Sequence, residues 1–80
     1  MNTEIPLSEA KPGQTLRINR LELDGTMRRR LLDLGFIPGA DVHILRKSPL
    51  GDPVALRVSN TTIALRVEES SRIFGEVLGE

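Results

Sequence analysis

Apolar and polar residues alternate along several short segments of the chain. In the segment 15–23, Leu16 and Ile18 alternate with Arg17 and Asn19, and this two-residue period is typical of a β-strand with one buried face. Turn-forming residues such as glycine, proline and asparagine separate one segment from the next. The pattern predicts five strands, at residues 15–23, 41–47, 54–59, 62–67 and 73–78.

Two of these segments, 54–59 and 62–67, are predicted to form a hairpin. Asn60 and Thr61 between them would make a two-residue loop. A one-residue slip would turn every inward side chain outward, so the alternation restricts the register. The predicted register pairs Val58 with Ile63, Leu56 with Leu65, and Val54 with Val67.

One segment follows a helical period instead. In residues 26–35, the positions of Met27, Leu31 and Leu34 place the three side chains on one face of a helix. Thr26 is predicted to cap the start of this helix. We therefore expect a helix with one buried stripe, inserted after the first predicted strand.

The end of this helix is marked by Gly35 and Phe36. Glycine adopts the left-handed backbone conformation without strain, and a hydrophobic residue after it packs back on the last turn, here on Leu31. Pro38 and Gly39 then favour a turn. A shorter helical turn is predicted at residues 6–13.

These elements together predict a mainly β fold with short helices. Short strands joined by tight turns favour a closed or nearly closed barrel, because closure leaves no exposed sheet edge. A chain of 80 residues is enough for one domain. We expect residues 1–80 to form a single small β-barrel of about five strands.

Composition narrows the classes of function. Lys and Arg together number 11, as do Asp and Glu, and this balance argues against non-specific binding to nucleic acid or to a membrane surface. The chain has no cysteine, which excludes thiolate metal sites and favours the cytosol. No signal-peptide pattern and no apolar run long enough for a bilayer are found. We expect a cytoplasmic protein that does not itself insert into a membrane.

Residues for catalysis or metal binding are few. The only histidine is His43, which lies between the inward positions Val42 and Ile44 and is therefore predicted to face solvent. Ferrous iron favours histidine together with carboxylates, and Asp41 on the same face would give only two ligands. We predict a protein that is not an enzyme, with no catalytic, cofactor-binding or metal-binding residues.

Three consecutive arginines, Arg28, Arg29 and Arg30, are predicted in the first turn of the helix. The positive end of the helix dipole disfavours cations there. Residues that go against a local structural preference often have a function. In one interpretation they contact acidic groups of another protein. In the other they serve the fold, with Arg29 paired to Asp33, Arg30 along the edge of the core and Arg28 in solvent. Both interpretations stay open.

The loop 49–53 is the second candidate site. Leu50 would lie at its tip without an evident place in the core, and an exposed apolar tip is typical of a docking contact. The alternative is that Leu50 folds back over the mouth of the barrel. We take Leu50 and Asp52, with the three arginines, as candidate partner-binding residues.

The order and spacing of three motifs resemble the FeoA family (ferrous iron transport protein A). The motifs are residues 28–39 (RRRLLDLGFIPG), 49–53 (PLGDP) and 64–69 (ALRVEE). The resemblance implies an SH3-like barrel with a small helical insertion. It further implies a cytosolic accessory or regulatory protein of bacterial ferrous iron uptake, whose partner is FeoB, a membrane permease with a cytosolic GTPase domain.

Other interpretations of function are a generic SH3-like interaction module or an RNA-binding small barrel, both unrelated to iron. SH3 grooves for proline-rich peptides are lined with aromatic residues, whereas this chain has two phenylalanines and neither tryptophan nor tyrosine. The same scarcity leaves no stacking platform for RNA bases. The leading hypothesis is therefore contact with a FeoB-type permease from the cytosolic side, which would recruit the protein to the inner membrane. Pairing of two copies through a free strand edge stays open.

Overall fold

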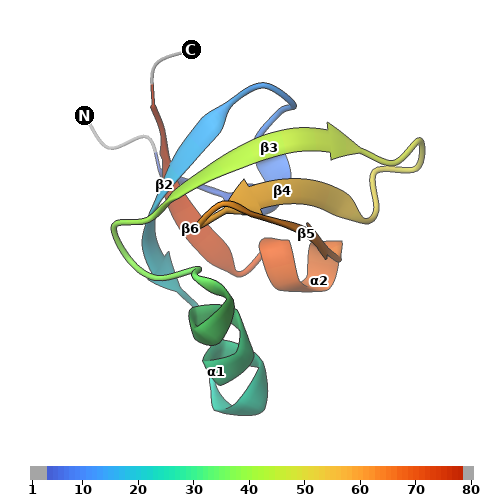
Figure 1. Cartoon of the computed structure of the whole chain (residues 1–80). Coiled ribbons are helices and arrows are strands. Elements are labelled where there is room, and N and C mark those ends of the chain that lie inside the picture. The colour runs from blue at the N-terminus through green and yellow to red at the C-terminus, as the bar shows by residue number, and fades with distance from the viewer. Residues whose placement is uncertain (1–3, 79–80) are drawn as a thin grey trace.

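The computed structural model describes residues 4–78 (Figure 1). Most elements are strands, and the helices are short. In chain order they are β1 (Glu4–Pro6), the 3-10 helix η1 (Leu7–Glu9), β2 (Thr15–Leu21), α1 (Gly25–Leu34), β3 (Asp41–Lys47), β4 (Val54–Val58), β5 (Thr61–Leu65), α2 (Val67–Ser70) and β6 (Ile73–Val77). The predicted mainly β fold with short helices is confirmed.

All the strands belong to one antiparallel sheet, in the order β1-β6-β2-β3-β4-β5. Figure 1 shows this sheet curled on itself, with α1 projecting from one end and the loop after β3 projecting from another side. The described residues form six strands rather than about five. The strand absent from the prediction is β1, which is too short for an alternating pattern and pairs with β6 through Ile5 and Gly75.

The core lies inside the curled sheet and is closed by residues from η1 and α1. Close contact between β2 and β6 requires a glycine, because a Cβ atom at Gly75 would lie 2.1 Å from the carbonyl oxygen of Arg17. The fully or nearly fully buried apolar residues are Leu7, Ala10, Leu16, Ile18, Leu21, Leu31, Phe36, Val42, Ile44, Val54, Leu56, Val58, Leu65 and Ile73.

The β4–β5 hairpin forms, but its predicted register is wrong by two residues. Leu56 pairs with Ile63, and Val54 pairs with Leu65. The loop consists of Ser59 and Asn60, with φ of 51° and 63°, as a type I′ turn requires. The shift is an even number of residues, so the apolar side chains keep their inward face.

Val67 is consequently not a strand residue. It was predicted as the last residue of a strand but begins the helical turn α2, and its side chain is 41% exposed. The backbone N–H of Arg66 donates to Oε1 of Glu69 at 3.1 Å, which ties the start of α2 to its last turn. Glu69 itself is buried.

Helix α1 begins one residue before its predicted start. Asp24 occupies the N-cap position without a side-chain capping bond, so the prediction that Thr26 caps the helix is wrong. Of the predicted stripe, Leu31 is fully buried, Leu34 is half-buried and Met27 is 36% exposed. The stripe is only partly covered because the first half of α1 extends away from the sheet.

The predicted end of α1 is confirmed. Gly35 has a φ of 111°, its N–H donates to the carbonyl of Leu32, and the N–H of Phe36 donates to the carbonyl of Leu31, both at 3.0 Å. These two bonds form a Schellman motif. Phe36 is fully buried in the same apolar cluster as Leu31, so this end of the helix is anchored in the core.

Candidate functional site

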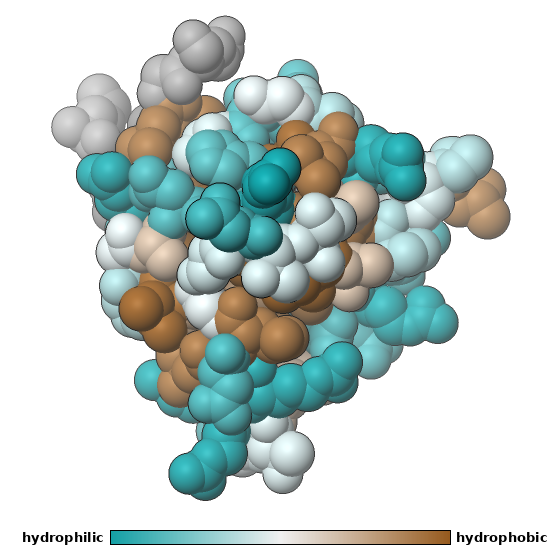
Figure 2. All heavy atoms as spheres, viewed as in Figure 1, coloured by the Kyte–Doolittle hydropathy of each residue, from teal (hydrophilic) through white to brown (hydrophobic). Residues whose placement is uncertain are grey.

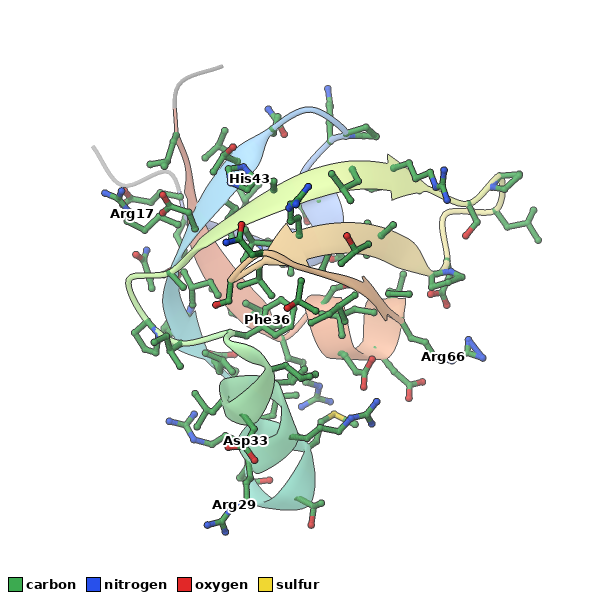
Figure 3. The ribbon with its side chains drawn as sticks, in the orientation of Figure 1. Arg17, Arg29, Asp33, Phe36, His43 and Arg66 are labelled. Carbon is green, nitrogen blue, oxygen red and sulfur yellow. The ribbon has the colours of Figure 1, made fainter. Side chains whose placement is uncertain are left out.

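The arginine run lies on the projecting part of α1. Arg28 is half-buried, and its Nη1 donates to the carbonyl oxygen of Leu21 at 3.4 Å. Arg29 and Arg30 are exposed. In Figure 3 the Arg29 side chain points away from the sheet, near the far end of the helix. The run thus divides into one arginine that contacts the barrel and two that face solvent.

Neither exposed arginine has a carboxylate partner among residues 4–78. The ion pairs in this part of the chain are Arg17 with Asp41, Arg20 with Glu4, and Arg20 with Glu22. The particular contacts expected if the arginines serve the fold are therefore not the ones that form. Arg29 and Asp33 do not pair despite their i, i+4 spacing, Arg30 is exposed, and Arg28 is not fully solvated.

The loop between β3 and β4 presents Leu50, which is 95% exposed. Figure 1 shows this loop extending beyond the ends of β3 and β4. Hydrogen bonds close its base: the Ser48 hydroxyl donates to the carbonyl of Pro53 at 2.7 Å, and the N–H of Gly51 donates to the carbonyl of Ser48 at 2.7 Å. Leu50 does not fold back over the barrel, and the loop holds it in solvent.

Asp52 has a different place from Leu50. Its Oδ1 accepts a hydrogen bond from the backbone N–H of Val67 at 3.0 Å. The carboxylate thereby ties the loop to the first residue of α2. Within the predicted set, Asp52 positions the loop, while Leu50 is the side chain available to a partner.

A shallow groove between α1 and α2 was not predicted from the sequence. Its walls are formed by Leu23, Asp24 and Met27 on one side and by Glu68 and Arg72 on the other. Met27 in the wall is a partly exposed apolar residue, as is Val67 at the start of α2. The available signal was Met27, an apolar residue that was assigned to the buried stripe of α1 but lines this groove.

His43 is exposed, as predicted, and its Nδ1 lies 2.8 Å from the hydroxyl of Thr15. Asp41 pairs with Arg17, with 3.0 Å between Nε and Oδ1. Over residues 4–78, no group of three or more His, Asp or Glu side chains is placed to hold a metal ion. In the same residues, no helix has the length and apolarity to cross a membrane.

The surface around these residues has mixed character. Figure 2 shows apolar side chains beside the hydrophilic side chains of α1, and an isolated apolar residue on the projecting loop. The curled sheet of short antiparallel strands, with one projecting helix and an exposed loop, defines a small SH3-like barrel. A model of the FeoA domain matches residues 5–77. The chain belongs to the FeoA family.

Relatives of known structure agree with this assignment. The solution structure of iron(II) transport protein A from Clostridium thermocellum is 40% identical, with a TM-score of 0.90, over 94% of this chain and 46% of that chain. FeoA of Stenotrophomonas maltophilia, solved in complex with zinc and described as a prokaryotic SH3 domain protein, is 29% identical. Its TM-score is 0.79, over 90% of this chain and 89% of that chain.

A curated relative joins two proteins in one chain. It is the Fe(2+) transport protein A/Fe(2+) transporter FeoB fusion protein of Porphyromonas gingivalis, 35% identical over 72 residues. The match covers 90% of the present chain but only 8% of the fusion protein. The present chain therefore corresponds to a small part of that relative.

Proposed function

We propose that this protein is a cytoplasmic accessory protein of ferrous iron uptake, and that it acts by binding the cytosolic part of a FeoB-type permease. The observation that carries the proposal is the Porphyromonas gingivalis relative, in which the matching region and FeoB share one chain. Fusion keeps two partners at a high effective concentration. A separate chain of the same family needs a binding surface to achieve the same association.

The first part of that surface is the solvent-facing side of α1, with Arg29 and Arg30. Because α1 begins at Gly25, both lie in its second turn and not in the predicted first turn, exposed to solvent, and residues 4–78 offer them no carboxylate. Guanidinium groups form strong, often bidentate hydrogen bonds with carboxylates. The two arginines would therefore bind acidic side chains of the permease.

The second part is the tip of the β3–β4 loop. Leu50 exposes nearly all of its side chain, and burying a leucine side chain contributes about 1.5–3 kcal/mol relative to leaving it exposed. The hydrogen bonds of Ser48 and Asp52 hold the loop in one shape, so little ordering entropy is lost on binding. Leu50 would enter an apolar pocket of the permease.

Helix α2 connects the two parts. The Asp52 carboxylate ties α2 to the loop. On its other side, α2 faces α1 across the shallow groove that Met27 lines. In Figure 1, α2 lies between the loop and α1. A partner that covers α2 would reach both the arginines and Leu50, with Val67 as a further apolar contact.

Capture of the purified cytosolic domain of the cognate permease by the full chain tests the arginine surface. We expect the double variant Arg29→Glu, Arg30→Glu to weaken capture by about tenfold or more, because charge reversal places like charges together. The matched control is Arg46→Glu, Arg57→Glu, which reverses two exposed arginines on β3 and β4. Equal capture by the two double variants and the natural chain would contradict the role of α1.

The loop is tested separately with Leu50→Ser. Its control is Leu45→Ser, because Leu45 is also exposed but lies on β3 and not on the loop. Capture should fall for Leu50→Ser and stay unchanged for Leu45→Ser, and every variant should keep the unfolding temperature of the natural chain within a few degrees. Failure of the natural chain itself to capture the domain would reject the proposed function.

A further inference from the structure

Strand β5 is an edge of the sheet, and its outer side has free backbone groups. In a two-residue hairpin the residues that flank the loop, here Val58 and Thr61, exchange both backbone hydrogen bonds. Alternation then directs the N–H and C=O of Thr62 and Ala64 away from β4. Within residues 4–78, no hydrogen bond to these four groups is found outside the hairpin.

The two edges of the sheet differ in how they are protected. At the other edge, β1 spans only three residues and ends with Pro6, which has no N–H to donate. β5 has the sequence Thr61-Thr62-Ile63-Ala64-Leu65, without a charge or a proline. Thr62 and Ala64 are both exposed. β5 therefore lacks the features by which edge strands usually avoid pairing with another chain.

We infer that β5 pairs with β5 of a second copy of this chain, antiparallel and centred on Ile63. In this register Thr62 faces Ala64 of the second copy, and Ala64 faces Thr62 of the second copy. Both pairs are hydrogen-bonded, so all the free backbone groups on the two strands acquire partners. The two sheets then continue into each other across a two-fold axis.

Other antiparallel registers leave some of the free N–H and C=O groups of Thr62 and Ala64 without good hydrogen-bond partners. Pairing centred on Thr62 would bring Ala64 opposite Asn60, whose φ of 63° is not extended. Pairing centred on Ala64 would bring Thr62 opposite Arg66, whose N–H already donates to Glu69. The Ile63-centred register is the one that satisfies both free residues of both strands.

The side chains agree with this pairing. On the outer face, the small side chains of Thr62 and Ala64 meet without like charges, and Figure 2 shows weakly polar side chains over this part of the sheet. On the inner face, Ile63 meets Ile63 of the second copy, and each is only partly covered by its own core. An apolar cross-strand pair of this kind favours association.

The contact is small, because each copy contributes only a five-residue strand. Stable complexes bury about 800 Å² on each partner, so we expect a dimer that forms at high protein concentration and dissociates on dilution. Arg29, Arg30 and Leu50 lie outside β5, and the pairing does not depend on the proposed function.

Single cysteines test both the pairing and its register, because the natural chain has none. In the inferred register, two Ile63 residues form a pair without backbone hydrogen bonds, with Cα atoms about 4.5 Å apart, within the range of a disulfide. Under mild oxidation, Ile63→Cys should give a disulfide-linked dimer, so that the band at 8.9 kDa moves to that of two chains.

Two further variants give the matched controls. Thr62→Cys alone and Ala64→Cys alone should each stay monomeric, because like residues lie two positions apart across the axis. A mixture of the two should form the mixed dimer. Adding Ala64→Pro, which removes an outward N–H and no bond to β4, should abolish the Ile63→Cys dimer, while Ala64→Val should keep it.

Two results would overturn the inference. One is that Ile63→Cys stays monomeric at high concentration while its thermal unfolding shows a folded protein. The other is that all three cysteine variants cross-link equally, as random collisions would give. The inference would also be contradicted if the natural chain formed a dimer but Ile63→Cys did not cross-link, because association would then use another surface.

Discussion

The two ends of α1 have very different surroundings. At its C-terminal end, Gly35 and Phe36 form the Schellman motif, and Phe36 is fully buried against the core. Over its first six residues, by contrast, Arg29 and Arg30 are exposed and Met27 is only partly covered. One short helix thus contains both an anchor for the fold and a surface for a partner.

This difference separates residues that determine stability from residues that are free for binding. Substitutions at the anchored end should lower the free energy of unfolding, whereas substitutions in the projecting part should change association and leave stability within about 0.5 kcal/mol. The β3–β4 loop follows the same division, with Asp52 bonded to α2 and Leu50 in solvent. Measurements of stability for variants in the two parts of α1 therefore test this division.

The largest expected effect is that of Phe36→Ala. Removing a fully buried phenylalanine leaves a cavity and should lower the free energy of unfolding by about 3–5 kcal/mol. In a domain of this size, that is a large part of the total stability. Chemical denaturation measures the change. The neighbouring Ile37→Ala is the control, because Ile37 is 47% exposed. Similar losses for both would show that the C-terminal end of α1 is not anchored.

A smaller loss is expected for Gly35→Ala. At a φ of 111°, a side chain strains the backbone, at a cost of about 1–2 kcal/mol. The new Cβ atom would also lie 2.6 Å from Oγ of Ser59, so the hairpin loop must move. Gly39→Ala is a matched control, with a φ of 93° and no atom within 4 Å of the Cβ position. If Gly39→Ala destabilises the protein as much, the contact with Ser59 does not contribute.

A gain in stability is expected for Ser70→Ala. The Ser70 side chain is fully buried, and its Oγ has no hydrogen-bond partner among residues 4–78. Because an unsatisfied buried hydroxyl is unfavourable, its removal should raise the free energy of unfolding by about 1 kcal/mol. Ser71→Ala, at the less buried next position, should have a smaller effect. A lower unfolding temperature for Ser70→Ala would contradict this account of α2.

The sequence predicts the anchored end of α1 because its signals are local. Gly35 and Phe36 determine the Schellman motif through their own residue types and their distance from Leu31. The hairpin loop was misplaced because serine rarely indicates a left-handed conformation, although Ser59 adopts one. Alternation could not correct the error, since a shift of two residues preserves the face of every side chain.

The surface residues were harder to predict, because their environment depends on distant parts of the chain. The spacing of Arg29 and Asp33 permits an ion pair that does not form, since exposed pairs add little stability. Whether Leu50 folds back or stays in solvent depends on hydrogen bonds between the loop and α2, through Asp52. These bonds connect residues far apart in the sequence, and no local pattern indicates them.

The smallest expected effect concerns acid stability at the edge strand β1. The hydrogen bond from Arg20, and then the one from Asn19, lower the pKa of Glu4 below its ordinary value of 4.5. Because the folded state holds the carboxylate in its charged form, this stabilisation is present above pH 4.5 and is lost as the pH falls through the lowered pKa. Glu4→Gln should therefore reduce the dependence of the unfolding temperature on pH below 4.5. Glu9→Gln, at an exposed position on η1, is the control, and an equal change for both variants would show that the contact between Glu4 and Arg20 does not hold β1 in place.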